Sequence, residues 1–203
     1  MKIDKYEKLS KGKYRLYLDT GEVIDTYDDI ILKHNLLIKK ELTPSIYDEI
    51  PKDNLIYENY NACLKYITVR IRSTKEIIDY LKRKKTSEID IDKIVEKLQK
   101  ENLLNDDYFT KCFINDKLKF TSWGKYRIKN ELKKHSIDSI IIDKYLNNIT
   151  YEQLYEKLNK LIEKQIKSNH KLDNNKLRNK IYHNFINLGY ESSMISDILN
   201  EKL

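Results

Sequence analysis

An apolar pair with helical spacing recurs three times along this chain, at intervals of about fifty residues. The three pairs are Ile77 with Leu81, Ile128 with Leu132, and Ile181 with Phe185. Residues four apart share one face of an α-helix, so each pair predicts a helix with one buried side. Successive pairs are offset by 51 and 53 residues. A repeat of this length is typical of arrays in which each unit buries its apolar face against others.

Each recurrence includes two further helical patterns. A second apolar pair follows each first pair: Ile94 with Leu98, Ile142 with Leu146, and Ile195 with Leu199. An amphipathic stretch precedes each first pair: "YNACLKYI", "DDYFTKCFINDKL" and "YEQLYEKLNKLIEKQI". The sequence therefore predicts three tandem three-helix repeats, over residues 57–104, 105–149 and 150–203.

Capping residues stand at several of the predicted helix starts. These are Ser73 with Glu76, Thr150 with Gln153, and Asn105 ahead of two aspartates. The first two pairs match the capping box, in which two side chains satisfy backbone N–H groups reciprocally. Asp106 and Asp107 could be read as a catalytic carboxylate pair, but adjacent residues on a helix point different ways. We interpret them as charges that favour a helix N-terminus.

Residues 1–56 show a different pattern. Residues 13–27 alternate apolar and polar side chains around the turn sequence Asp19–Glu22, which predicts a β-hairpin. "YDDIILKHNL" predicts a short helix, and Thr43 with Pro44 predicts another helix start. The expected fold is mainly α, with tandem three-helix repeats and a small N-terminal β-hairpin.

Charge is concentrated in the later part of the chain. The formal net charge is +7, but residues 1–56 carry 10 basic and 11 acidic residues, a net of −1. Residues 57–203 carry 29 and 21, a net of +8. A polyanion or an acidic protein surface is one explanation, and a solvated lysine-rich surface is the other.

The chain lacks the signatures of several function classes. Cys63 and Cys112 have no metal-ligand spacing and fall at equivalent places in two repeats, where small residues pack between helices. The four histidines, His34, His135, His170 and His183, have no carboxylate or cysteine at triad or ligand spacing. No glycine-rich phosphate loop, signal peptide or membrane span is evident. We expect no enzyme activity, no metal and no cofactor, and a cytoplasmic protein.

The middle helix of each of the first two repeats is strongly basic. A helical projection places Ile77 and Leu81 inward, and two basic positions then superpose, Lys82 on Lys133 and Arg83 on Lys134. A basic face at one repeated position favours a binding surface over a merely solvated one. The candidate partner-binding residues are Arg70, Arg72, Lys75, Lys82, Arg83, Lys125, Arg127, Lys129, Lys133 and Lys134. Trp123 is either a packing anchor or a base-stacking residue.

Three segments resemble the RecX family of recombination regulators: "ACLKYITVRIRSTKEIIDYLKRK", "LLNDDYFTKCFINDKL" and "GKYRIKNELKKHSID". The matching residues are Ala62, Leu64, Arg70, Arg72, Ser73 and Glu76, then Leu104, Asp106, Asp107 and Phe109, then Gly124, Arg127, Ile128, Glu131 and Leu132. Ser136 stands where the family usually has glycine. The resemblance is clearest over residues 57–146.

The resemblance implies a non-enzymatic protein that regulates DNA repair within the SOS response by binding the RecA recombinase filament. Such proteins lie along the filament groove and typically inhibit its ATPase and strand exchange or promote its disassembly. We expect a monomer that contacts RecA and, weakly and electrostatically, single- or double-stranded DNA. Two alternatives stay open: a DNA-binding protein that is not sequence-specific, and a helical adaptor for another acidic protein.

Overall fold

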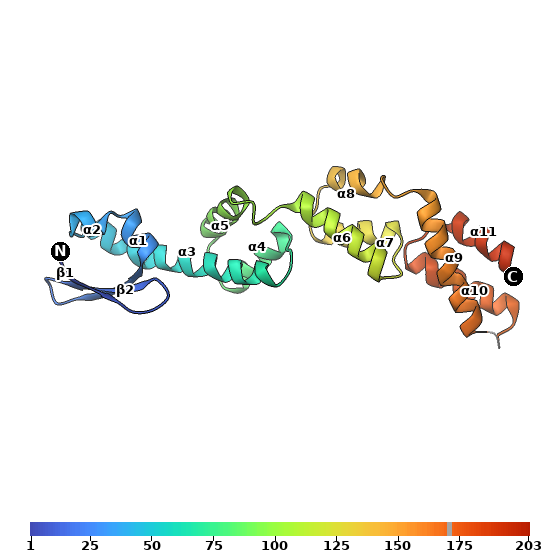
Figure 1. Cartoon of the computed structure of the whole chain (residues 1–203), viewed down its shortest axis with the longest axis horizontal. Coiled ribbons are helices and arrows are strands. Elements are labelled where there is room, and N and C mark those ends of the chain that lie inside the picture. Colours follow the sequence, from blue (N-terminus) through green and yellow to red (C-terminus); the bar gives the residue numbers. More distant parts are fainter. Residues whose placement is uncertain (170–171) are drawn as a thin grey trace. The chain divides into compact units, whose positions relative to one another are not determined.

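The computed structural model describes residues 1–169 and 172–203 of this protein (Figure 1). Along the chain lie β1 (Ile3–Lys8), β2 (Lys13–Leu18), β3 (Val23–Tyr27), α1 (Asp28–Lys33), α2 (Leu36–Lys39), α3 (Pro44–Val69), α4 (Thr74–Arg83), α5 (Glu88–Lys100), α6 (Asp106–Phe120), α7 (Lys125–Lys134), α8 (Ser139–Leu146), α9 (Tyr151–Ser168), α10 (Asn174–Asn187) and α11 (Ser192–Lys202). This succession confirms the predicted class, mainly α with tandem three-helix groups.

The backbone divides into two compact units. The first comprises Met1–Arg70 with Tyr80–Leu98, and the second comprises Ile71–Asp79 with Gln99–Leu203. The boundary therefore passes through α4.

The N-terminal sheet has three antiparallel strands in the order β1-β2-β3. The predicted hairpin of β2 and β3 is present, but the prediction was incomplete because β1 pairs with the free edge of β2, with Tyr6 opposite Leu16. In β1, "IDKYEK", only Ile3 is buried. Such a strand has almost no apolar alternation of its own, and its pairing depends on β2.

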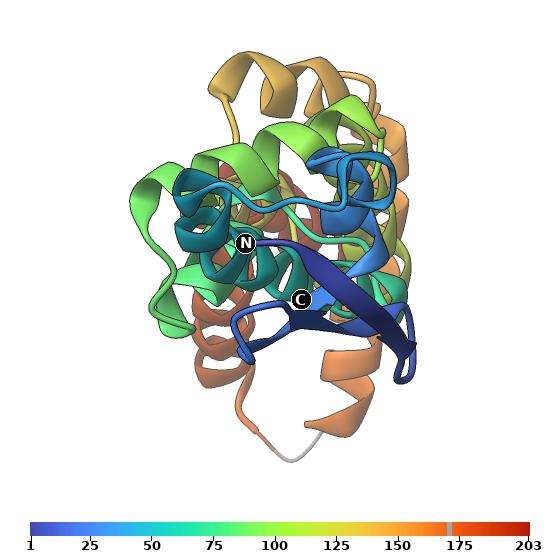
Figure 2. The same ribbon diagram turned by 90° about the vertical axis from the view of Figure 1, so that its left-hand side faces the viewer.

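Helices α1, α2 and the start of α3 close a small core over the sheet in the first unit (Figure 2). The core consists of Ile3, Leu16, Leu18, Ile30, Ile31, Leu36, Leu42 and Ile50. Asn54 of α3 accepts a hydrogen bond from Thr26 at 2.9 Å and donates one to the Asp25 carbonyl at 2.8 Å. These bonds fix α3 against β3, so the sheet is anchored to the helical part of its unit.

Two boundaries in the N-terminal region differ from the prediction. The single short helix predicted over "YDDIILKHNL" ends at Lys33, because Asn35 adopts a left-handed backbone (φ 54°) before α2 begins. The predicted start at Thr43 is confirmed, since its hydroxyl accepts a hydrogen bond from the Ile46 N–H. Helix α3 then continues through Pro51 as one helix of 26 residues, past residue 57 where the first repeat was expected to begin.

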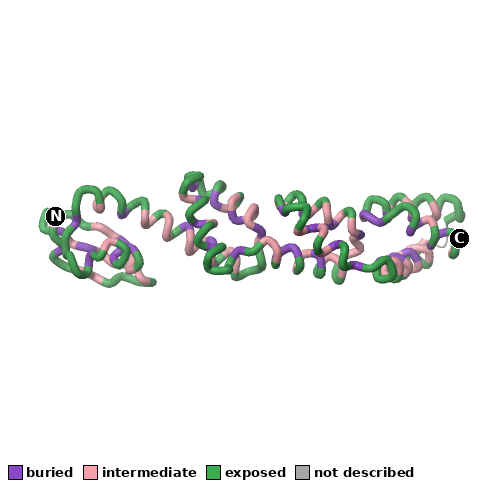
Figure 3. The backbone as a smooth tube through the Cα atoms, turned by 90° about the horizontal axis from the view of Figure 1, so that it is seen from above, coloured by how far each residue is buried: buried purple, intermediate pink, exposed green. Residues whose placement is uncertain are grey.

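The repeated apolar pairs form the buried faces of the helices, as predicted (Figure 3). All twelve residues are at most 4% exposed. The capping predictions are also confirmed. The Ser73 hydroxyl accepts from the Glu76 N–H while the Glu76 carboxylate accepts from the Ser73 N–H, and Thr150 with Gln153 forms the same reciprocal pair. Asn105 accepts from the Tyr108 N–H at the start of α6.

The turn after each middle helix is built in the same way three times. Lys85, Ser136 and Gly189 follow α4, α7 and α10 at equivalent positions, and all three have positive φ, of 59°, 57° and 85°. The next N–H donates to a carbonyl five residues earlier, from Thr86 to Leu81, from Ile137 to Leu132 and from Tyr190 to Phe185. This pattern is the Schellman type of helix end, which satisfies carbonyls that the helix leaves open.

Two junctions in the second unit are equivalent as well. At the start of α4, the Ser73 hydroxyl lies 3.2 Å from Nδ1 of His135, which ends α7. At the start of α7, the Gly124 N–H donates to the Leu188 carbonyl at 2.7 Å, where α10 ends. The beginning of one middle helix thus contacts the end of the next middle helix, and this relation is what makes the segments a repeat in three dimensions.

Candidate partner-binding surface

The C-terminal ends of α4 and α7 present the same pair of basic side chains. Lys82 and Arg83 end α4, Lys133 and Lys134 end α7, and all four are exposed. They lie on the sides of their helices away from Leu81 and Leu132, which are fully buried. The helical phase inferred from the sequence is therefore confirmed.

Two of these four residues have no ion-pair partner among the residues that the structure describes. Lys82 Nζ lies 3.8 Å from the Glu88 carboxylate, and Lys134 Nζ lies 2.7 Å from the Glu131 carboxylate. Arg83 and Lys133 form no ion pair with any described residue. At each of the two helix ends, ion pairs within the described residues therefore compensate only one of the two positive charges.

Basic residues in the last turn also stabilise a helix through its dipole, which offers a purely structural explanation. The third repeat limits that explanation. Ile186 and Asn187 occupy the equivalent positions of α10, which has no basic residue in its last turn and still forms 14 residues of helix. A middle helix can therefore form without cations in its last turn, so the helix dipole alone does not account for the two basic pairs.

Other predicted residues form contacts inside the protein. The Arg72 guanidinium lies 3.4 Å from the Glu76 carboxylate with its side chain only 9% exposed, and Lys75 lies 3.5 Å from Asp79. These two residues, which the sequence predicted to bind a partner, therefore form ion pairs that stabilise the start of α4. A partner could reach Lys75 more readily than Arg72.

Two lysines of α7 hold the second repeat together. Lys129 Nζ lies 2.6 Å from Asp143 of α8, and Lys125 Nζ donates to the Ile149 carbonyl at 2.7 Å. Both contacts join segments that are far apart in the sequence, so the sequence pattern could not separate them from solvent-facing lysines.

Trp123 is surrounded by cations of its own chain. The Arg127 guanidinium lies 4.6 Å from the indole centre and Lys117 Nζ lies 4.9 Å from it, and the ring packs against the core of the second unit. These contacts favour the packing role over base stacking. Arg70, the remaining predicted residue, is exposed at the end of α3.

The histidines and cysteines have structural surroundings where the structure describes them. His34 Nε2 lies 2.7 Å from Asp53, and His183 packs edge-on to Tyr182. His170 lies outside the described residues. Burial raises the pKa of the Cys63 thiol to about 11, which makes it a poor nucleophile. In the part of the chain described, no three His, Cys, Asp or Glu side chains gather as a metal site. None of the described helices is long and apolar enough to cross a membrane.

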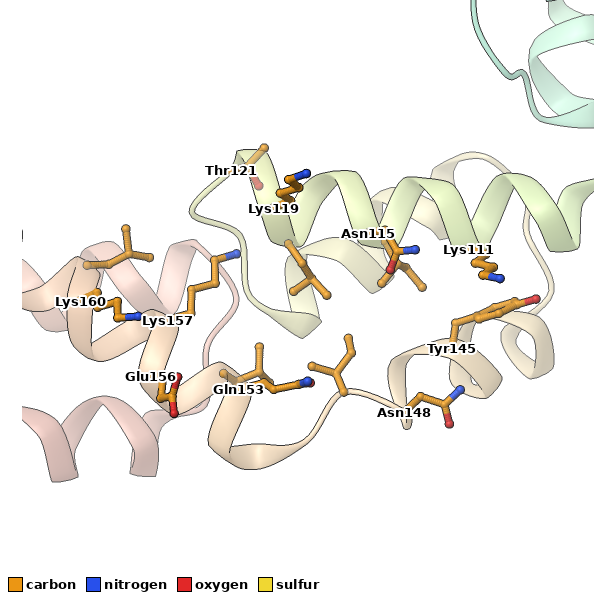
Figure 4. Close-up of a pocket in the computed structure, with 15 residues that line it drawn as sticks. Lys111, Asn115, Lys119, Thr121, Tyr145, Asn148, Gln153, Glu156, Lys157 and Lys160 are labelled. Carbon is orange, nitrogen blue, oxygen red and sulfur yellow. The ribbon is translucent and has the colours of Figure 1, made fainter.

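A groove between α6 and α9 carries a second group of basic residues that the sequence analysis missed (Figure 4). Lys111 and Lys119 reach it from α6, and Lys157 and Lys160 from α9. The two helices are separated in sequence by the whole of α7 and α8, so no local pattern indicated that these lysines meet.

Two segments of the chain match models of known protein domains. A family model described as "RecX, first three-helix domain" matches residues 60–98, and one described as "RecX, second three-helix domain" matches residues 105–146. These matches contain the end of α3 with α4 and α5, and then α6, α7 and α8.

Proteins similar along most of the chain carry the same name. "Regulatory protein RecX" of Oceanobacillus iheyensis is 26% identical over 200 residues, covering 96% of this chain and 74% of the relative. "Regulatory protein RecX" of Clostridium beijerinckii is 28% identical over 197 residues, covering 96% of this chain and 92% of the relative. A crystal structure of regulatory protein RecX has the same fold over 98% of both chains, with a TM-score of 0.86 and 23% identity. Both RecX domain models match this chain in order, and RecX proteins of two species are similar to 96% of its length, so the chain resembles the RecX family along nearly its whole length.

Proposed function

We propose that this protein binds the RecA recombinase filament on DNA and inhibits the ATPase and strand exchange of the recombinase. Similarity to regulatory proteins of the RecX family supports a binding function rather than catalysis. The observation that carries the proposal is the repeated exposed basic pair, Lys82 with Arg83 and Lys133 with Lys134. A repeated feature suits a repeating partner.

A filament offers the same surface many times, and tandem repeats can engage successive copies of it. Each exposed lysine or arginine contributes little by itself, because water screens its charge. When several such contacts form within one complex, the later ones form at high effective concentration, so the sum is much stronger than any part. Binding of this kind favours one conformation of the filament and opposes the changes that accompany ATP hydrolysis.

Direct binding to DNA is the second candidate, and the net charge of +8 in residues 57–203 favours it. Lysine and arginine displace counterions from phosphates, so such binding weakens steeply as salt increases. RecA filaments contain DNA, and both contacts can occur in one complex. The protein is expected to act as a cytoplasmic monomer.

Co-sedimentation distinguishes these candidates. The purified protein is mixed with RecA assembled on single-stranded DNA with a non-hydrolysable nucleotide, with RecA alone and with DNA alone. We expect the protein to pellet with the filament at salt concentrations that abolish its binding to DNA alone, and to lower the DNA-dependent ATPase of RecA. Equal binding to bare DNA and to the filament at every salt concentration would favour the second candidate instead.

A further inference from the structure

The groove between α6 and α9 is a cavity of about 950 Å³. Its walls come from α6, from α9 and from the segment that includes Tyr145, Asn148 and Ile149 (Figure 4). A cavity of this size, with a few polar groups converging on an apolar surface, is typical of a ligand-binding site.

The charge of the groove is strongly positive. Lysines 111, 119, 157 and 160 line it with one carboxylate, that of Glu156. Among the described residues none of the four lysines has an ion-pair partner, and Lys157 Nζ instead donates to the Trp123 carbonyl at 3.1 Å. Four lysines against one carboxylate in a concave surface attract an anionic ligand and lose hydration when they bind it.

The floor of the groove is aliphatic. It consists of Ile114, Leu118, Ile149, Leu154 and Leu161. Tyr145 is the one aromatic side chain in the lining, and its hydroxyl is held by the Asp107 carboxylate. Sites for single-stranded nucleic acid stack bases on aromatic rings, which this floor does not provide. Aliphatic side chains suit an apolar amino-acid side chain instead.

The dimensions suit a short extended peptide. Lys111 and Lys119 are eight residues apart on α6, which corresponds to about 12 Å along the helix axis. An extended chain covers that distance with about four residues. A peptide can therefore place carboxylates near both lysines and an apolar side chain between them.

We infer that this groove is a docking site for an extended acidic segment of a partner protein, with an apolar residue seated on the aliphatic floor and carboxylates on the lysines. The site is separate from the basic ends of α4 and α7. The docking site does not depend on the proposed binding to the RecA filament. It is tested with short labelled probes in the absence of RecA, so either proposal can fail without the other.

The test uses fluorescence anisotropy with three labelled probes and the full chain. The first is an eight-residue peptide of aspartate and glutamate with two central leucines, the second replaces the leucines with glycine, and the third is an oligothymidylate of eight nucleotides. Two variants alter the groove. K111E/K119E/K160E reverses its charge, and Asn148→Trp fills it from an exposed position without changing charge. The matched control is K52E/K164E/K176E, which changes exposed lysines outside the groove.

We expect the leucine peptide to bind about tenfold more tightly than the glycine peptide, since a leucine side chain is buried on the aliphatic floor. Both groove variants should weaken its binding about tenfold or more, and the control less than about threefold. Circular dichroism verifies that every variant is folded. The inference fails if the leucine peptide does not bind, if the glycine peptide binds equally well, or if groove and control variants behave alike. Stronger, groove-dependent binding of the oligothymidylate would also overturn it and identify a nucleic-acid site.

Discussion

Gly124 and Gly189 lie against each other backbone to backbone, where the start of α7 meets the end of α10. A β-carbon on Gly124 would lie 2.3 Å from the Gly189 carbonyl oxygen, and one on Gly189 would lie 2.3 Å from the Arg127 backbone nitrogen. Two hydrogen bonds span the contact, from the Gly124 N–H to the Leu188 carbonyl and from the Tyr126 N–H to the Gly189 carbonyl. The second and third repeats are therefore joined by main-chain atoms, which leave no space for a side chain.

Gly189→Ala should destabilise the protein by more than about 2 kcal/mol, because the backbone itself must move to admit a methyl group. Gly21→Ala is the matched control. Gly21 has nearly the same φ, 84° against 85°, but nothing lies within 4 Å of the added carbon. Denaturant unfolding of both variants separates the backbone strain, which they share, from the steric clash, which only Gly189→Ala has. Equal losses of stability would show that the two repeats do not meet as described.

Ser136→Gly should stabilise the protein by about 0.5–1 kcal/mol. Ser136 has φ of 57° and occupies the position that Gly189 fills in the third repeat. A residue with a β-carbon pays a steric penalty in this region that glycine avoids, although glycine loses more entropy on folding. Ser139→Gly, in the first turn of α8, is the control and should destabilise. Thermal unfolding of the pair checks the prediction, and a lower melting temperature for Ser136→Gly would contradict it.

Leu81→Ala and Leu132→Ala should each cost about 2–5 kcal/mol, because each removes a fully buried side chain and leaves a cavity. Ile140→Ala is the control, since Ile140 is 80% exposed and its loss should cost less than about 0.5 kcal/mol. The free energies of unfolding come from urea titration. A small loss at either leucine would mean that its helix is turned differently.

Lys157 should make stability depend on pH in an unusual direction. Burial lowers the pKa of its ammonium group from 10.5 to about 8. In the unfolded chain the lysine keeps its proton up to the higher value, so between about pH 8 and 10.5 the unfolded state binds more protons than the folded state. Stability therefore rises with pH across this window, as the penalty of burying a charge disappears.

The contribution of Lys157 is isolated by comparison with Lys157→Met, which does not titrate. The difference in unfolding free energy, wild type minus variant, should increase between pH 8 and 10.5 by on the order of 1–2 kcal/mol, after discounting for partial exposure of the group. Chemical denaturation at several pH values measures it. A difference that stays constant or decreases with pH would show that the ammonium group is well hydrated.

The sequence predicted the repeat because the buried residues of each helix are close together in the sequence. Ile128 and Leu132 lie four residues apart on one helix, and the same relation returns in each repeat, so periodicity alone identified the core faces. Strand β1 has no comparable signal, since its pairing is supplied by β2. Helix α3 continues through Pro51, although proline removes a backbone hydrogen bond, and the sequence pattern did not indicate that one helix runs from Pro44 to Val69.

The candidate site was predictable only in part. The exposed pair Lys133 and Lys134 followed from the helical phase, but the sequence could not show that Lys129 is paired with Asp143 or that Lys125 is bonded to the Ile149 carbonyl. These contacts join different helices, and a tertiary contact leaves no trace in local spacing. The groove between α6 and α9 was missed for the same reason.

In the proposed function, the repeated basic pairs bind the RecA–DNA filament. Replacing Lys82, Arg83, Lys133 and Lys134 with glutamate should preserve the helical circular dichroism signal, since all four are exposed and glutamate is a good helix former. The control carries the same number of reversals at exposed lysines of the N-terminal region: Lys2, Lys8, Lys11 and Lys52.

The most direct measurement is co-sedimentation of the two quadruple variants with RecA assembled on single-stranded DNA, over a series of salt concentrations. The predicted result is that the first variant loses most of its binding and most of the salt dependence of what remains, while the control binds nearly as well as wild type. Equal binding by both variants would contradict the claim, and would mean that the basic ends of α4 and α7 are a solvated surface.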